Sequence, residues 1–138
     1  MAHTVLYDPR FTFNTVDLSD HVSEMELEVS TDQLEDIAGG DTVVTFLAGL
    51  RRFGGTISGM GDYTVGEVDA TIMTAWSTRS AVAVTIGPDK TSAISTSNPE
   101  YQFSGFVAEY RPSLRMNTEN RWTLRIAPTT DLTRDVTP

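Results

Sequence analysis

The sequence predicts a mainly β domain with a single α-helix, and three observations support this prediction. Apolar side chains alternate with polar ones in several short runs, as they do in strands that bury one face. One segment instead repeats its apolar residues at helical spacing. The chain has 138 residues, of which 39% are hydrophobic. This length suits one compact domain, which we expect to span residues 1–138.

The strands are expected in six runs of alternating or β-branched sequence. In the fifth run, Phe103 is expected on the face opposite Tyr110, and Gly105 between them indicates a bulge or a close approach of another segment. The six runs are residues 11–18, 22–29, 52–60, 80–87, 101–110 and 121–127.

Residues 22–29 carry the clearest alternation of the six runs. One face holds Met25, Leu27 and Val29, and it requires a core. The opposite face is a row of carboxylates with no basic residue in the run, formed by Glu24, Glu26 and Glu28. This row is either a solvated outer face or a wall that must not hold an anion.

The helix is expected from Thr64 to about Ser77. Thr64 and Glu67 have the spacing of a capping box, in which the threonine caps the first turn and the glutamate reaches back. The apolar stripe of this helix consists of Val65, Val68, Ile72 and Trp76. Because the stripe is narrow and one-sided, the helix should lie on a sheet.

Residues 30–50 are expected to form a long loop. The first half of this segment is polar and contains glycine, and the second half is apolar. A loop of this length is uncommon inside a compact domain, and it is usually functional or ordered by a partner. An extended N-terminal arm and a C-terminal arm over about 129–138 are also expected.

Charge is segregated along the chain. The formal net charge is -9, and residues 1–45 hold ten acidic groups against one basic group. Residues 111–125 carry four arginines against Glu119 alone. An acidic first third and a basic patch near the end predict two unlike surfaces, which can pair within one chain or between copies. The acidic balance argues against general affinity for nucleic acids or anionic membranes.

Catalysis has almost no support in the sequence. His3 lies near the terminus, and Ser19, Asp20 and His21 are consecutive, so they cannot converge as a catalytic triad and are expected to form a polar turn. The acidic residues offer no way to choose the two that a glycosidase needs. Two glycine-containing acidic segments, 36–41 and 59–62, match no calcium-loop spacing. We therefore expect no enzyme activity, no metal and no cofactor.

Cysteine is absent, which fits a reducing compartment and leaves no disulfide or thiolate chemistry. The N-terminus lacks the pattern of a secretory signal, and no apolar run approaches the length of a membrane span. No membrane partner is expected.

The order of motifs resembles that of the major tail (tail tube) proteins of long-tailed, non-contractile bacteriophages, over about residues 16–127. An acidic strand and a long segment are followed by a helix and then by a strand that leads to an arginine-proline pair. The motifs that carry the resemblance are Phe46-Leu47-Ala48-Gly49-Leu50-Arg51-Arg52-Phe53-Gly54-Gly55-Thr56-Ile57-Ser58-Gly59, Asp62-Tyr63, Val68-Asp69-Ala70, Ser97-Asn98-Pro99-Glu100-Tyr101, Gly105-Phe106-Val107 and Tyr110-Arg111-Pro112.

The resemblance implies two packed antiparallel sheets, as a sandwich or barrel, with a flanking helix. It implies a homo-oligomeric ring, with six copies, whose rings stack into a tube that DNA traverses without specific binding. The loop and both arms would reach neighbouring subunits, and other tail proteins would meet the tube ends. The protein would be in the host cytoplasm during assembly and in the virion tail afterwards.

Two sets of residues are candidates for roles in such a tube. A wall of carboxylates and hydroxyls would let DNA slide, whereas basic side chains would hold its phosphates. The candidates for the lumen wall are Glu24, Glu26, Glu28, Thr56 and Ser58, with a solvated outer face as the alternative. The candidates for the subunit interface are Asp32, Glu35, Asp36, Asp41, Arg51, Arg52, Arg111, Arg115, Arg121 and Arg125.

Two other functions remain open. One is a tail terminator or completion protein of related fold. The other is a monomeric β-sandwich that binds carbohydrate or a host surface. Such a module should expose aromatic side chains with no internal role, whereas Trp76 and Trp122 both lie on predicted apolar stripes.

Overall fold

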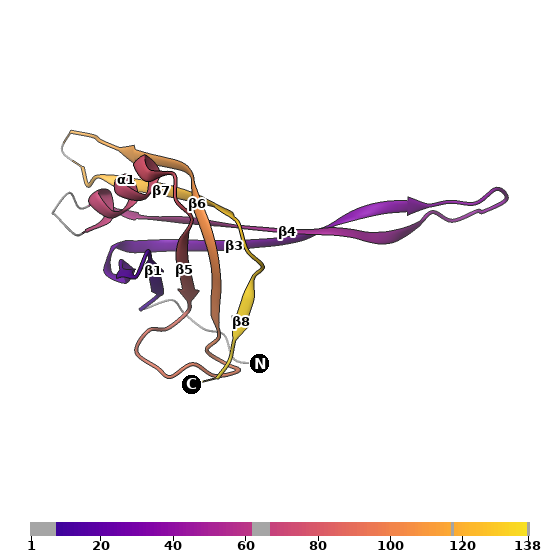
Figure 1. Ribbon diagram of the computed structural model, residues 1–138, viewed down its shortest axis with the longest axis horizontal. Helices are drawn as coiled ribbons and strands as arrows, with labels where there is room; N and C mark the ends of the chain where they lie inside the picture. The colour runs from indigo at the N-terminus through magenta and orange to yellow at the C-terminus, as the bar shows by residue number, and fades with distance from the viewer. Residues whose placement is uncertain (1–7, 62–66, 117, 138) are drawn as a thin grey trace.

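A computed structural model describes residues 8–61, 67–116 and 118–137 (Figure 1). Within these residues the chain forms eight strands, one short 3₁₀ turn and one α-helix. Their bounds are β1 Arg10–Phe13, β2 Val16–Asp17, η1 Ser19–His21, β3 Val22–Asp36, β4 Thr45–Met60, α1 Val68–Thr78, β5 Val82–Gly87, β6 Glu100–Ser113, β7 Arg121–Pro128 and β8 Thr133–Asp135. The mainly β class with one helix is confirmed.

The strands form one hydrogen-bonded antiparallel sheet in the order β2-β1-β5-β6-β7-β4-β3, with β8 paired to β6. This sheet folds back on itself. Phe53 in β4 and Phe103 in β6 stack edge to face, with ring centroids 5.3 Å apart, although β7 separates their strands in the sheet. A Cβ on Gly55 in β4 would lie 3.6 Å from Ile86 in β5. The two packed layers expected from the sequence are therefore two halves of one continuous sheet.

The core lies between these layers and is closed on one side by α1. Trp122, Leu124 and Ile126 of β7 are buried, as their alternation predicts. The core also contains Phe11, Phe13, Leu18, Ile57, Val68, Ile72, Ala75, Val82, Val84, Ile86, Phe103 and Val107. Its members come from six elements and the segment before η1, so one core organises the described chain.

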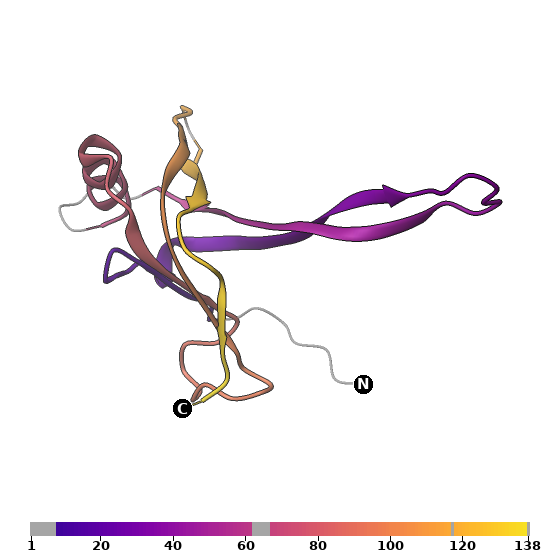
Figure 2. The same cartoon turned by 45° about the vertical axis from the view of Figure 1, so that its right-hand side comes forward.

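The expected long loop over residues 30–50 is corrected to a β-hairpin. β3 and β4 stay paired far beyond the body of the domain, from Ser30↔Arg52 to Asp36↔Thr45, and only residues 37–44 form the turn. Figures 1 and 2 show this hairpin projecting as a long arm. The arm has no core beneath it, so its sequence lacks the alternation that marks a half-buried strand, while the partner strand still satisfies the backbone.

The predicted helix is shifted, and its capping box is not formed as expected. Thr64 lies outside the described residues, and the helix begins at Val68 with Glu67 at the N-cap position. Glu67 makes no capping hydrogen bond, and its Oε2 lies 2.8 Å from His21 Nε2. The buried stripe is Val68, Ile72 and Ala75, whereas Trp76 is 57% exposed.

A bulge in β6 corrects the expected orientation of Tyr110. The register with β7 shifts between Val107 and Glu109, so Tyr110 turns toward the core side of the sheet. Its hydroxyl donates a hydrogen bond to Asp69 Oδ1 of α1 at 3.0 Å. The bulge adds one residue and therefore reverses the faces of all residues that follow it.

Candidate assembly surfaces

The arm, residues 29–52, exposes apolar side chains along its whole length. Val29, Phe46 and Leu50 are 64%, 56% and 72% exposed. The other exposed apolar residues of the arm are Leu34, Ile37, Val43, Val44 and Leu47. Exposed apolar area of this extent is typical of interaction surfaces.

Both faces of the arm are apolar in part. Leu34 pairs with Leu47 across the two strands, so these side chains share one face. The next pair, Glu35 and Phe46, lies on the opposite face. An arm that is apolar on both faces is suited to insertion between partners rather than to lying flat on one of them.

The acidic candidates for the subunit interface lie on this arm. Asp32 accepts two hydrogen bonds from the Arg52 guanidinium, at 2.9 and 3.1 Å. These bonds hold the pKa of Asp32 below its usual range and raise the pKa of Arg52. Asp41 accepts a hydrogen bond from the Ala38 amide at 2.6 Å, which orders the turn. Glu35, also a candidate, is exposed, as is Asp36.

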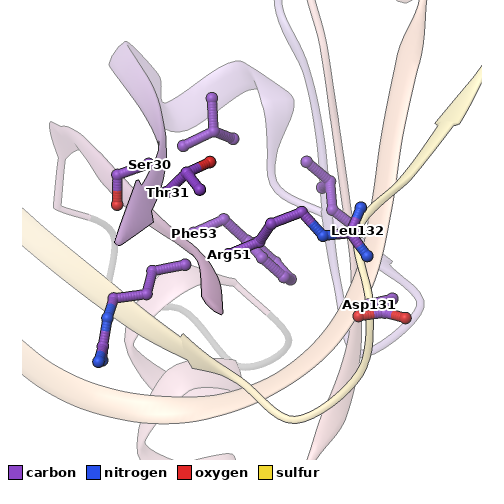
Figure 3. Close-up of a pocket in the computed structure, with 8 residues that line it drawn as sticks. Ser30, Thr31, Arg51, Phe53, Asp131 and Leu132 are labelled. Atoms are coloured by element: carbon purple, nitrogen blue, oxygen red, sulfur yellow. The ribbon is translucent and has the colours of Figure 1, made fainter. Parts of the chain in front are cut away.

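A groove of about 410 Å³ lies at the base of the arm. It is bounded by the arm strands and by the segment that precedes β8, which carries Asp131 and Leu132 (Figure 3). Arg51, another interface candidate, lines the groove together with Phe53 and Thr31. Arg51 therefore lies where the arm leaves the body.

The five candidates for the lumen wall share one face of the sheet. The register pairs Glu24 with Ser58 and Glu26 with Thr56, and residues paired in this way project to the same side. Glu28 lies on the same side, opposite Gly54. The structure thus brings this predicted set together, and all three carboxylates are exposed.

The same face continues onto β7 and β6 and carries three of the arginines predicted for the interface. Arg125 pairs with Thr56 on one side and with Glu109 on the other. Arg121 pairs with Met60, and Arg111 pairs with Thr123. Arg115 lies between β6 and β7 and borders a groove with Arg121. The sequence pattern predicted that the carboxylate row and the arginines belong to separate surfaces. In the structure they lie on one face of the sheet, on neighbouring strands.

Sequence reasoning missed one exposed aromatic patch. Trp76 and Phe106 line a groove of about 660 Å³ with Arg79, between the end of α1 and β6. Met73 on the same helix is also exposed. The argument that both tryptophans have internal roles holds for Trp122, which is 1% exposed, and fails for Trp76. At helical spacing Val68, Ile72 and Ala75 lie within one narrow stripe and Trp76 lies at its margin, so Ala75 was the better choice for the buried face.

The segment Ser19–His21 is held in place by hydrogen bonds of Ser19. Ser19 Oγ accepts a hydrogen bond from the Phe11 amide at 2.9 Å, and Ser19 is also bonded to Asp17. Burial alone would raise the pKa of Asp17, but the hydrogen bonds from Ser19 and the charge of Lys90 lower it overall. The Ser19–His21 segment is thus a local turn, as expected. Among residues 8–61, 67–116 and 118–137, no group of three metal-binding side chains converges.

The part of the chain that the structure describes contains no helix long and apolar enough to cross a membrane.

Comparisons with known proteins rest on the fold. No protein-family model matches the sequence, and no curated protein sequence matches it. The SPP1 tail tube is similar over 97% of this chain and 80% of that one, with 9% identity and a TM-score of 0.75. A chain of the tail of an empty gene transfer agent particle, with C6 symmetry, is similar over 83% of this chain and 82% of that one. That match has 10% identity and a TM-score of 0.68.

A third similar structure comes from a terminator. It belongs to the sheath/tube terminator of an extracellular contractile injection system, with 11% identity and a TM-score of 0.71. The match covers 98% of both chains. At these identities the likeness is one of fold, and the chain has the fold of phage tail tube proteins, as its sequence resemblance implies.

Proposed function

We propose that this protein is a structural subunit of a phage-type tail tube, in which copies join into rings and the rings stack. The observation that carries this proposal is the long arm, because it exposes eight large apolar side chains that no other described part of the chain covers. The tail-tube fold supports the same proposal, and the C6 symmetry of one similar assembly favours six copies in a ring.

The arm contacts neighbouring subunits in this proposal. Fully burying one large apolar side chain contributes roughly 1.5–3 kcal/mol. Covering three or four of them is therefore comparable with the lower part of the estimated cost of association, about 4–15 kcal/mol. Because contact surfaces differ on the two partners, the association is heterologous and can close into a ring or continue along an axis.

The polar face of β3 and β4 lines the channel in this proposal. Glu24, Glu26 and Glu28 present carboxylates, and Thr56 and Ser58 present hydroxyls beside them. The β3 and β4 part of this face offers DNA phosphates no attractive contact, so the genome moves along it without being held. In this proposal the protein is a structural subunit of the virion tail rather than an enzyme.

A terminator role on the same fold is the second candidate, favoured by the likeness to a sheath/tube terminator. The two roles differ in whether further rings add to the first one. A tube subunit adds further rings at high concentration, whereas a terminator stops at one ring. Electron microscopy of the purified protein over a range of concentrations distinguishes them, and a particle that stays monomeric throughout contradicts both.

Replacing the arm tests its role directly. Residues 33–48 are removed at the paired positions Gln33 and Ala48 and replaced by an Asn-Gly turn, which suits a two-residue hairpin. We expect this variant to remain folded, because the removed residues lie outside the core, and to lose ring stacking. Electron microscopy and analytical ultracentrifugation measure the loss.

Point variants on the intact arm provide matched controls. Phe46→Ser with Leu47→Ser removes apolar contacts from both faces, and Gln33→Ser with Thr45→Ser changes polar positions on the same strands. The apolar pair should reproduce the loss of stacking and the polar pair should not. Tubes of normal length from the arm-replaced variant would show that stacking does not depend on the arm.

A further inference from the structure

Two strands at opposite ends of the polar face each have one side without a strand neighbour among the described residues. β3 is the last strand of the sheet and pairs with β4 alone. β6 pairs with β5 only as far as Gly105, and its continuation to Ser113 pairs with β7. The order β6-β7-β4-β3 therefore ends in an open edge on each side, and such edges are ready to pair with another chain.

The two open edges carry opposite charge on the polar face. No basic residue lies on β3 between Glu24 and Glu28 or on β4 directly opposite them. At the other edge, β6 itself carries Arg111 and Glu109 on this face, and Arg121 and Arg125 lie on β7, one strand in from the edge. Glu109 already binds Arg111 and lies 3.8 Å from Arg125. The β3 edge is thus acidic. The region at the β6 edge keeps a net positive charge after Glu109 is paired with an arginine.

These charges select between two ways of joining copies. A two-fold contact of β3 with β3 would bring two carboxylate rows together, and like charges on facing strands are destabilising. A contact of β3 with β6 brings opposite charges together. The four strands alternate in direction, so β6 of a second copy runs antiparallel to β3 and continues the sheet.

The positions of the glutamates along β3 also match the position of Arg111 along β6. Across one copy, Glu24, Ser58, Thr123 and Arg111 form one row. Joining copies without stagger places Glu24 beside Arg111. A closed barrel requires a stagger of its strands, and a stagger of two or four residues in one direction places Glu26 or Glu28 there instead. Each of these three registers supplies a carboxylate for Arg111, and the register that places Glu28 there is the one that keeps the other two glutamates away from Glu109.

We propose that the carboxylate row Glu24, Glu26 and Glu28 of one copy pairs with the basic edge Arg111, Arg121 and Arg125 of the next copy. This pairing fixes the head-to-tail direction of the ring, so the partner is a second copy of this chain. It rests on the proposed function, and it implies that the carboxylates near each boundary are compensated by arginines, so the channel wall alternates in charge.

Two charge-reversed variants test this pairing. Variant A carries Glu24→Lys, Glu26→Lys and Glu28→Lys, so both of its edges are basic. Variant B carries Arg111→Glu, Arg121→Glu and Arg125→Glu, so both of its edges are acidic. Opposite-charge cross-strand pairs contribute a few tenths to about 1 kcal/mol each, and like pairs oppose association. Each variant alone should need at least about a tenfold higher concentration than the wild type to form rings.

An equal mixture of the two variants is the decisive measurement. Every boundary between A and B again joins an acidic edge to a basic one, so the mixture should form rings at close to the wild-type concentration, with A and B alternating. Native mass spectrometry reads the composition of the rings. A control reversal on β8, Arg134→Glu, lies beside the other end of β6 and should assemble like the wild type, and circular dichroism checks that all variants are folded.

The outcomes separate this inference from the function on which it depends. If the wild type forms rings and either variant alone does so equally well, or the mixture gains nothing over its components, the charge pairing is wrong and the tube role stands. If the wild type forms neither rings nor tubes, both fail. Pairing of β3 with β3 predicts that variant B assembles normally.

Discussion

Gly105 lies where β6 passes from β5 to β7, and the packing leaves no room for a side chain there. A Cβ at this position would lie 2.6 Å from the Ala127 carbonyl oxygen and 2.7 Å from Ile126 Cγ2. The close approach expected from the sequence at Gly105 is confirmed. Because Ala127 belongs to a paired strand, its backbone cannot move without loss of the ladder.

We predict that Gly105→Ala destabilises the monomer by roughly 1–3 kcal/mol through overpacking. Urea unfolding measures this change. Gly54→Ala is a matched control, since a Cβ there meets only the Ile126 carbonyl oxygen at an ordinary 3.8 Å. Equal unfolding midpoints for the two variants would contradict the steric explanation.

Asp89 organises the connection between β5 and β6. Its carboxylate accepts hydrogen bonds from the Thr91 hydroxyl at 2.7 Å and amide at 2.9 Å, and from the Ser92 hydroxyl at 2.9 Å. These bonds, with that of the Thr91 hydroxyl the strongest, lower the pKa of Asp89 below the ordinary value of 3.8. Asn98, which is buried, donates to three carbonyls in the same loop, those of Asp89, Ser92 and Ala93.

We predict that the loop loses order in acid because of Asp89. A carboxyl group whose folded pKa is depressed stabilises the fold above its unfolded pKa, and this contribution is lost as the pH falls through the folded pKa. Protection of the loop amides in hydrogen exchange should therefore decline below about pH 4, after correction for the intrinsic pH dependence. Asp89→Asn should remove this decline, and an unchanged decline in that variant would assign it to another group.

Helix α1 buries a stripe that is narrower than the apolar spacing of its sequence indicates. The stripe of Val68, Ile72 and Ala75 faces the core, and Trp76 lies one position beyond it. Trp122 on β7, by contrast, is enclosed, and its indole N–H donates to the Met60 carbonyl at 2.6 Å. Two residues of the same type thus have different roles.

We predict that Trp76→Ala changes the stability of the monomer by less than about 0.5 kcal/mol, as is usual for an exposed position. Trp122→Ala should cost about 3–5 kcal/mol, because it opens a large cavity and leaves a carbonyl without its donor. Urea unfolding at a concentration where the protein is monomeric measures both. A large loss for Trp76→Ala would mean that the helix packs differently.

The arm is the element whose conformation could be predicted least from local sequence preference. Residues 30–36 are polar apart from Leu34 and residues 45–50 are largely apolar, so neither run alternates like a strand that covers a core. The two runs become strands because each supplies the other with backbone hydrogen bonds, pair by pair, from Gln33↔Ala48 to Asp36↔Thr45. A pattern that reports burial cannot detect an element that contributes nothing to the buried core of the described residues.

The whole molecule combines a compact body with a projecting arm (Figure 2). The body contains every member of the buried core, and the arm contains none. The arm-replaced variant described above should therefore keep the unfolding midpoint of the monomer while it loses assembly. Such a separation of folding from association is what a subunit needs if it must be soluble first and polymerise later.

The order of elements and most of the core followed from sequence patterns. Strands that bury one face, such as β5 and β7, follow a period of two because their side chains alternate between core and solvent, and this local rule needs no knowledge of the fold. Glu24, Glu26 and Glu28 could be placed on one face for the same reason, as could Thr56 and Ser58.

The relation between distant segments came from the folded chain alone. Local patterns could not show that the sheet folds back between β4 and β5, that a bulge turns Tyr110 toward α1, or that Arg125 lies beside Thr56. These relations depend on strand order and register, which are set by packing between residues far apart in sequence. The carboxylates and arginines were each visible in the sequence, but their shared face, with opposite charges at its two open edges, exists only once the four strands are paired.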